Sequence, residues 1–318
     1  RIARLASNEN PWPPSPAAVR AGCEALREAN RYPDECIAEL SRILVSFHGN
    51  YSFITGVGMD GVIETLVRVL VDPGDKVTVS VPTFSFYRLA ALAQGADVVE
   101  ILRAPDFSVD TRQFIRKAQD AKVSFLCTPN NPTGTVTPVE DIREILSAID
   151  GVLFLDNAYV EFSDTDYRSL MNEFDNLVIG RTMSKAFALA GARVGYAFVP
   201  RWLVPFYQRA ATPFTLNSVS AIAAAGALAD RERMDEYVSY VRKWRDRFRK
   251  ECPLSSPASG ANFIMFDTRP MSGDEMVRLL AGKGVIVRSC ASFPGLPDHY
   301  IRVSIGDVWE NETFLTAI

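Results

Sequence analysis

Histidine and cysteine are scarce in this sequence, and their scarcity narrows its chemistry. Only two histidines occur in 318 residues, His48 and His299, far apart along the chain. This argues against Ser-His-Asp and Cys-His mechanisms and against a histidine-rich metal site. The five cysteines are scattered without a Cys-x-x-Cys pair, so we expect no disulfide framework, no bound metal and a reducing cytoplasm as the location. In an enzyme of this composition, lysine is the obvious group for proton transfer.

Long apolar runs and a strong charge of one sign are also absent. No stretch of about 20 apolar residues occurs, so no transmembrane helix is expected. The net charge of −4 gives no electrostatic reason to expect nucleic acid or a membrane as partner. The first residue is Arg1 and not methionine, and we therefore expect an N-terminal piece to precede it.

What the sequence has in quantity is short apolar runs rich in Val, Ile and Phe, bounded by turn residues. These runs cover residues 76–81, 98–102, 123–127, 152–155, 177–179 and 194–199. Helix-like segments lie between some of them, at residues 61–70, 84–93 and 139–149, the last with Thr137 as its expected N-cap. Buried strands that alternate with amphipathic helices predict an α/β layer on a mostly parallel sheet.

The pattern changes after about residue 216. One long helical stretch is expected over residues 217–250, followed by short strands at 262–266, 285–288 and 301–304 and one helix at 274–280. This pattern predicts a smaller α+β domain. The proline-rich stretch 11–16 near the start has no periodicity, and we expect it to run extended along the surface.

One lysine stands in a suggestive setting, within segment 181–187. Lys185 follows an apolar strand and is flanked by Ser184 and small residues; alone, it is equally typical of a surface lysine. Arg193, eight residues later, changes that interpretation. An arginine fork and a serine hydroxyl can both reach one phosphate group.

Two further segments place polar groups at strand ends. Strand 152–155 runs into Asp156, followed by Tyr159; ligands bind at the carboxyl edge of open α/β sheets, although a lone acid there is more often a solvated loop residue. In turn 128–134, Asn131 lies between prolines, which makes its amide a well-fixed donor.

The glycine-rich turn 56–61 leads into a helix. The free N–H groups and the dipole of a helix N-terminus favour an anion such as phosphate. Many strand-to-helix turns look similar, so this motif is informative only together with the others.

In this order, the four segments resemble those of fold-type-I aminotransferases dependent on pyridoxal 5'-phosphate (PLP), and within them the histidinol-phosphate aminotransferase family. The resemblance covers nearly the whole chain and includes residues 7–11, 31–34, 81–87 and 300–306. It implies an α/β fold: a large domain with a mostly parallel seven-stranded sheet sandwiched by helices, plus a smaller α+β domain. The implied division is 1–28 for an N-terminal extended arm and part of the small domain, 29–220 for the large PLP-binding domain, and 221–318 for the small C-terminal domain.

The resemblance also implies a role for each matching residue. Lys185 would form the Schiff base with PLP and then carry a proton between substrate and cofactor, Asp156 would pair with the pyridine nitrogen, and Tyr159 would hold the ring's phenolic oxygen. The other implied cofactor contacts are Asn131 at the same oxygen, Phe84 stacked on the ring, and, at the phosphate, the backbone of Met59 and Asp60, the side chains of Ser184 and Arg193, and Tyr32 of the partner subunit.

For the substrate, the resemblance implies Arg302, with Arg288 as a second candidate and Asn10 beside them. The expected protein is a homodimer with shared active sites, and the expected reaction is L-histidinol phosphate plus 2-oxoglutarate giving imidazole-acetol phosphate and L-glutamate in a ping-pong cycle. Because Arg302 can hold a carboxylate as readily as a phosphate, transamination of an aromatic or another amino acid stays open. A phosphothreonine-type decarboxylase and a non-catalytic sensor of the same fold are the remaining alternatives.

Overall fold

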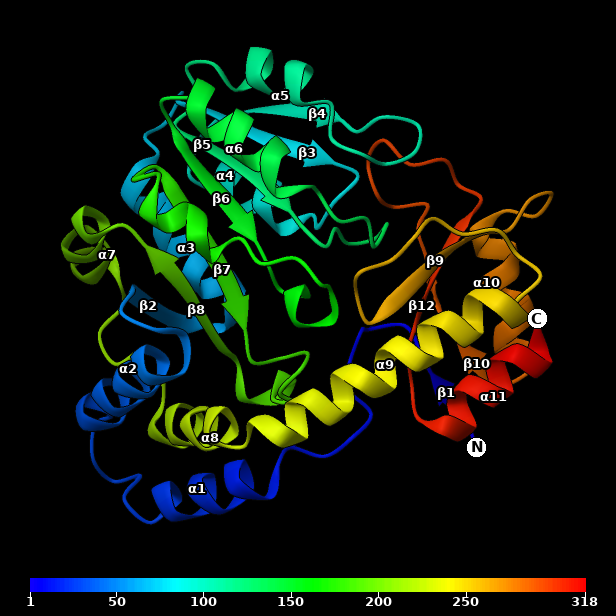
Figure 1. Ribbon diagram of the computed structural model, residues 1–318, viewed down its shortest axis with the longest axis horizontal. Helices are drawn as coiled ribbons and strands as arrows, with labels where there is room; N and C mark the ends of the chain where they lie inside the picture. The colour runs from blue at the N-terminus through cyan, green and yellow to red at the C-terminus, as the bar shows by residue number, and fades with distance from the viewer.

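Seven strands form one sheet in the order β2-β8-β7-β6-β5-β3-β4 (Figure 1). In the computed structural model, which describes residues 1–318, these strands are β2 Ser52–Val57, β3 Lys76–Val81, β4 Asp97–Leu102, β5 Val123–Cys127, β6 Val152–Asp156, β7 Leu177–Thr182 and β8 Val194–Val199. The strand β8 alone runs opposite to the other six. The predicted mostly parallel seven-stranded sheet is confirmed.

Helices cover both faces of this sheet (Figure 1). Every residue of β5, β6, β7 and β8 is buried, which explains why their sequences are mostly apolar. The helices are α1 Pro16–Leu26, α2 Asp34–His48, α3 Gly58–Leu70, α4 Phe86–Ala93, α5 Thr111–Ala118, α6 Val139–Ala148, α7 Val204–Ala210, α8 Ser218–Ala229, α9 Arg231–Glu251, α10 Gly273–Gly282 and α11 Val308–Ala317. Alternate side chains of β6 enter different cores. Phe154 packs with α3, α4 and α7, whereas Leu153 and Leu155 pack with α2, α5, α6 and α8.

The C-terminal part forms two small sheets beside α9, α10 and α11 (Figure 1). One is antiparallel with the order β11-β12-β9, formed by Arg288–Ser289, Tyr300–Ser304 and Phe263–Asp267. The other pairs β1 (Ala3–Arg4) with β10 (Val285–Ile286) in parallel. The single strand expected at 285–288 is therefore wrong: it divides at Val287 into β10 and β11, which belong to different sheets.

Two other details of the sequence prediction are wrong. The single helix expected over 217–250 is two helices, because the backbone of Asp230 leaves the helical region (φ −102°, ψ 62°) between α8 and α9. Thr137 does not cap α6. The helix begins after Pro138 without a side-chain cap, and the carbonyl oxygen of Thr137 instead accepts a hydrogen bond from the Tyr167 hydroxyl.

The proline-rich start of the chain is more closely packed than expected. The ring of Trp12 lies 5.2 and 5.0 Å from the rings of Tyr237 and Tyr240 on α9. Pro16 opens α1, where the Ser15 hydroxyl accepts a hydrogen bond from the Ala18 N–H at 3.1 Å. Aromatic packing therefore anchors part of the segment that was expected to run along the surface.

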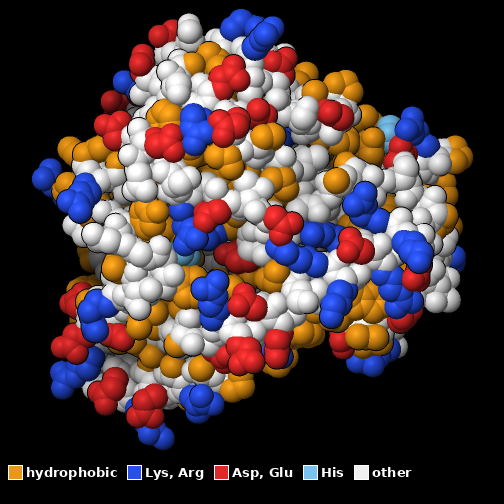
Figure 2. Space-filling model, in the orientation of Figure 1, with side chains coloured by type: hydrophobic (Ala, Val, Ile, Leu, Met, Phe, Trp, Pro, Cys, Tyr) orange, Lys and Arg blue, Asp and Glu red, His pale blue; other side chains and the backbone are white.

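The outer surface mixes charges of both signs. Figure 2 shows Lys and Arg side chains interspersed with Asp and Glu over the face in view. Several of these charges pair, as Arg143 does with Glu140 and Glu173. None of the helices is both long and apolar enough to pass through a bilayer.

Candidate active site

A pocket of about 150 Å³ lies where β5, β6 and β7 end and α3 begins. Asp156 is the last residue of β6, and Lys185 follows β7 by three residues, so parallel strands bring their ends to one edge of the sheet. Nine of the ten residues predicted to contact a cofactor line this pocket: Met59, Asp60, Phe84, Asn131, Asp156, Tyr159, Ser184, Lys185 and Arg193. Tyr87, Cys127, Ala158 and Thr182 complete the lining.

The carboxylate of Asp156 is buried, with only 4% of the residue exposed. Its Oδ1 accepts from the Ala158 N–H at 2.9 Å and its Oδ2 from the Tyr87 hydroxyl at 2.5 Å. Burial raises the pKa of Asp156 to about 6, and these two hydrogen bonds oppose the rise. The pocket thus contains a buried acid whose hydrogen-bond donors are both neutral, and it is suited to a cationic group.

Tyr159 and Asn131 are held by contacts from distant parts of the chain. The Tyr159 hydroxyl accepts a hydrogen bond from the Asn8 side chain at 3.1 Å. Burial raises the pKa of Tyr159 to about 12, so the hydroxyl keeps its proton and can donate it to a ligand oxygen. The Asn131 side-chain oxygen accepts from Arg302, which leaves the amide N–H₂ of Asn131 to donate.

The N-terminus of α3 forms a cradle with Arg193. Gly58 has φ +68°, a left-handed backbone conformation that favours glycine, and an added Cβ would lie 2.5 Å from Arg193 Nη2 and displace that side chain. Arg193 Nη2 pairs with Asp60 Oδ2 at 2.8 Å. The hydroxyl of Ser184 accepts from Thr182 at 2.9 Å and keeps its own proton available. Free helix N–H groups, a guanidinium and a hydroxyl together suit a phosphate. The helix begins at Gly58, three residues earlier than the sequence predicted.

Lys185 is the only lysine that lines the pocket. Burial lowers the pKa of Lys185 to about 8, and the nearby charge of Arg302 adds to the effect. Its Nζ lies 3.5 Å from the Ser7 carbonyl oxygen and 5.9 Å from the centre of the Tyr159 ring. An amine with this pKa loses its proton far more readily near neutral pH than an ordinary lysine, and its free form can act as nucleophile and base.

The residues predicted to bind substrate lie outside this lining. Arg302 is 7% exposed and donates to Asn131 and to the Ala6 carbonyl oxygen at 2.6 Å, the latter through Nη2. Arg288 faces Arg302 across the β11–β12 pair but is exposed, and it donates to Ser292 at 3.2 Å.

Asn10 and Tyr32 also lie outside the lining. The Asn10 side chain donates to the carbonyl oxygens of Lys185 and Ala186 at 3.3 and 3.5 Å, so it supports the lysine loop. Tyr32 is 76% exposed and stacks on Phe214 with ring centres 4.2 Å apart. Its ring is therefore directed away from the pocket of its own chain.

Sequence reasoning missed Tyr87 and Asn8 as site residues. Tyr87 follows Phe84 by three residues, and this spacing at the start of a helix was the available signal that both share one face. Asn8 is separated from Tyr159 by 151 residues, and no local sequence pattern predicts a contact over that distance. Cys127 is buried and also lines the pocket.

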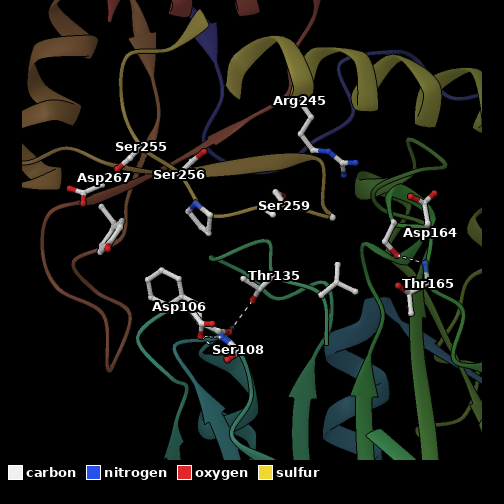
Figure 3. Close-up of a pocket in the computed structure, with 17 residues that line it drawn as sticks. Asp106, Ser108, Thr135, Asp164, Thr165, Arg245, Ser255, Ser256, Ser259 and Asp267 are labelled. Atoms are coloured by element: carbon white, nitrogen blue, oxygen red, sulfur yellow. Dashed lines mark hydrogen bonds between the residues drawn. The ribbon is translucent and has the colours of Figure 1, made fainter. Parts of the chain in front are cut away.

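The largest cavity, about 770 Å³, lies elsewhere (Figure 3). Most of its labelled side chains come from loops, Arg245 comes from α9 and Asp267 from the end of β9. Many are hydroxyls already bonded locally, for example Ser108 to Asp106 and Thr135 to the Phe107 carbonyl. Its arginine, Arg245, donates to two main-chain carbonyls. These polar groups hold the cavity walls together. The cavity contains no lysine, and it does not have the chemistry of the Lys185 pocket.

Comparison with known proteins gives consistent matches along the whole chain. The family model described as aminotransferase class I and II matches residues 1–318. The histidinol-phosphate aminotransferase of Methanoculleus marisnigri is 64% identical over 318 residues, which is 100% of this chain and 90% of that protein. The crystal structure of the Clostridium acetobutylicum histidinol-phosphate aminotransferase matches with TM-score 0.93 at 24% identity, over 99% of this chain and 98% of that one. The Sinorhizobium meliloti histidinol-phosphate aminotransferase, solved in complex with PLP, matches with TM-score 0.89 at 25% identity, over 100% and 90%.

Proposed function

This chain belongs to the class I and II aminotransferase family, and we propose that it transfers the amino group of L-histidinol phosphate to 2-oxoglutarate in the Lys185 pocket. The enzyme is a PLP-dependent transaminase that uses an amino donor and a 2-oxo acid. The observation that carries the proposal is the gathering of Lys185, Asp156 and the Gly58–Arg193 cradle around one pocket. The 64% identity to a histidinol-phosphate aminotransferase supports the choice of donor.

The residues of the pocket fit PLP in two independent respects. The buried Asp156 accepts only from neutral donors, and a protonated pyridine nitrogen would supply its positive partner. The cradle at the start of α3 suits the phosphate, because it combines the free N–H groups of a helix N-terminus with the Arg193 guanidinium and the Ser184 hydroxyl. When bound, PLP supplies an electron-withdrawing ring that stabilises negative charge developing at the substrate α-carbon.

The protein's own residues then orient the ring and move the proton. Lys185 would hold the cofactor through its amine, and the amine freed by the substrate would be placed to carry the proton to and from the substrate α-carbon. Its lowered pKa favours both tasks. Asn131 and Tyr159 would hold the phenolic oxygen as donors, and Phe84, on the same wall as Tyr87, would stack on the ring.

A substrate panel tests the proposed donor. We expect purified protein loaded with PLP to convert L-histidinol phosphate with a kcat/KM above that for any aromatic amino acid, with 2-oxoglutarate as acceptor. Glutamate formation is the readout for transamination, and release of carbon dioxide is the readout for a decarboxylase. A higher kcat/KM for an aromatic amino acid would contradict the proposed donor and favour an aromatic aminotransferase. Release of carbon dioxide without glutamate formation would contradict transamination and favour a decarboxylase.

We propose Arg302 as the group that binds the anionic end of the substrate. In Arg302→Gln we expect kcat/KM for glutamate to fall about 100-fold or more, because a buried charge partner is lost. The matched control is Arg288→Gln, which removes the exposed arginine across the same strand pair and should change kcat/KM much less. A larger effect of the Arg288 variant would assign the role to Arg288.

We further propose that the enzyme is a homodimer and that Tyr32 serves the partner subunit's site. The exposed Tyr32–Phe214 stack supports this, because it directs Tyr32 outward. A molecular mass of one chain, measured by sedimentation at the concentration used for the assays, would contradict the proposed dimer.

The five unpaired cysteines fit a reducing cytoplasm. We also propose the division of the chain at residues 28/29 and 220/221. The separate groups of sheets support a large and a small domain, whereas residues 220/221 lie inside α8, which packs in the same core as Leu153 and Leu155 of the large sheet.

A further inference from the structure

The acid of the pocket has a hydrogen-bond donor that the proposed function does not use. The Tyr87 hydroxyl donates to Asp156 Oδ2 at 2.5 Å, and Tyr87 itself is fully buried. Tyr87 comes from α4 and Asp156 from the end of β6, so this bond joins a helix on one face of the sheet to the strand that delivers the acid.

Packing fixes the direction of this donor. The Tyr87 ring is stacked on Phe125 of β5, with centres 5.0 Å apart and planes 7° from parallel. It also meets the edge of Phe84 at 5.6 Å and 83°. With both contacts in place, the hydroxyl has little freedom to move away from the carboxylate.

The carboxylate keeps acceptor sites after these bonds are made. A carboxylate has about four lone-pair positions on two oxygens. Tyr87 uses one position on Oδ2 and the Ala158 N–H uses one on Oδ1. A pyridine N–H can therefore be accepted without displacing either donor, and the direction of the remaining lone pairs is set by them.

Tyr87 also influences whether Asp156 is charged. Burial favours the neutral acid, and the hydrogen bond from Tyr87 is the largest of the influences that lower its pKa. The titratable groups that face Asp156 are Tyr87, Cys127, Tyr159, Asp60 and Lys185. Of these, Tyr87 is the one that donates a hydrogen bond to the carboxylate.

We propose that Tyr87 is a positioning residue that acts through Asp156: its hydroxyl holds the carboxylate in one orientation and in the ionised form that a pyridinium requires. This inference rests on the proposed function, because it concerns the same pocket and the same cofactor. Tyr87 itself would not take part in the proton transfer.

The test is the variant Tyr87→Phe, which keeps the ring stack and removes the hydroxyl. We expect the dissociation constant for PLP, measured by titrating cofactor-depleted protein, to rise about 10- to 100-fold at neutral pH, the effect of one hydrogen bond to a charged group. Asp156 will ionise at a higher pH without its donor, so the pH below which PLP affinity declines should move upward. The control is Tyr167→Phe, which removes another buried hydroxyl that bonds Thr128 and Thr137 and not Asp156. It should leave both quantities unchanged.

A double-mutant cycle separates positioning from packing. If Tyr87 acts through the carboxylate, Tyr87→Phe in an Asp156→Ala background, which has no side-chain acceptor for the hydroxyl, should change PLP affinity less than about twofold. An equal loss in both backgrounds, or an unshifted pH dependence, would overturn the inference. Wild-type protein that fails to bind PLP would instead overturn the proposed function. Melting temperatures of the two tyrosine variants, measured without PLP, show whether both fold.

Discussion

Replacing Lys185 by alanine is expected to lower kcat by at least about 10⁴-fold, the upper end of what a positioned acid–base group contributes. Lys185 is the single amine of the pocket, and burial lowers its pKa to about 8. The variant loses both the covalent attachment of PLP and the proton carrier at the α-carbon. The measurement is steady-state formation of glutamate by PLP-loaded protein.

The matched control is Lys243→Ala. Lys243 is an exposed lysine on α9, outside the pocket, and its loss should leave kcat within experimental error. Added methylamine offers a second check, because a small soluble amine can enter the space left by the side chain and restore part of the activity. A Lys185→Ala protein that still turns over near the wild-type rate would show that another group carries the proton.

The second large effect is expected for Asp156→Asn, which should lower kcat and raise the stability of the protein without PLP. Asparagine keeps the shape and an acceptor for Tyr87 but loses the charge, so the pyridine nitrogen has no buried anionic partner. We expect kcat to fall about 10²- to 10³-fold, which corresponds to breaking a buried ion pair. The measurement is kcat at saturating PLP, which separates this loss from weaker binding of the cofactor.

The same substitution should stabilise the protein when PLP is absent. The pKa of Asp156 is about 6 in the folded protein, whereas an unperturbed aspartate, as in the unfolded chain, has a pKa of 3.8. The folded state therefore binds a proton at this carboxylate more tightly than the unfolded state does. The charged Asp156 carboxylate therefore lowers the free energy of unfolding of the wild-type protein. This loss is absent below about pH 4, grows between the two pKa values, and reaches about 3 kcal/mol above pH 6. Cofactor-depleted Asp156→Asn should therefore melt several degrees higher than wild type at neutral pH and the same at acid pH. A lower melting temperature at neutral pH would contradict this view of the acid.

The central sheet was predictable from the sequence because its strands are buried on both faces. Such strands are mostly apolar, and residues 76–81, 123–127 and 194–199 were located without error. Strand β2 was missed because its residues are mostly half-buried at the edge of the sheet and its sequence is interrupted by Thr55 and Gly56. The break between α8 and α9 depends on one backbone conformation at Asp230, which no propensity specifies.

The pocket was predictable for a related reason. Motifs that follow parallel strands meet at one edge of the sheet, so Asn131, Asp156 and Lys185 had to converge once the sheet formed. The hydrogen bonds that orient the side chains of the pocket could not be predicted from the sequence. The bonds from Tyr87 to Asp156 and from Asn8 to Tyr159 join residues far apart in the chain, and the packing of whole elements decides them.

The most direct test asks which side chain PLP attaches to. Wild-type protein loaded with PLP is reduced with sodium borohydride, which makes a lysine–pyridoxyl linkage permanent, and the digested peptides are analysed by mass spectrometry. We predict one modified peptide, with the added mass on Lys185. Modification of a different lysine, or none after full loading, would contradict the assignment of this pocket.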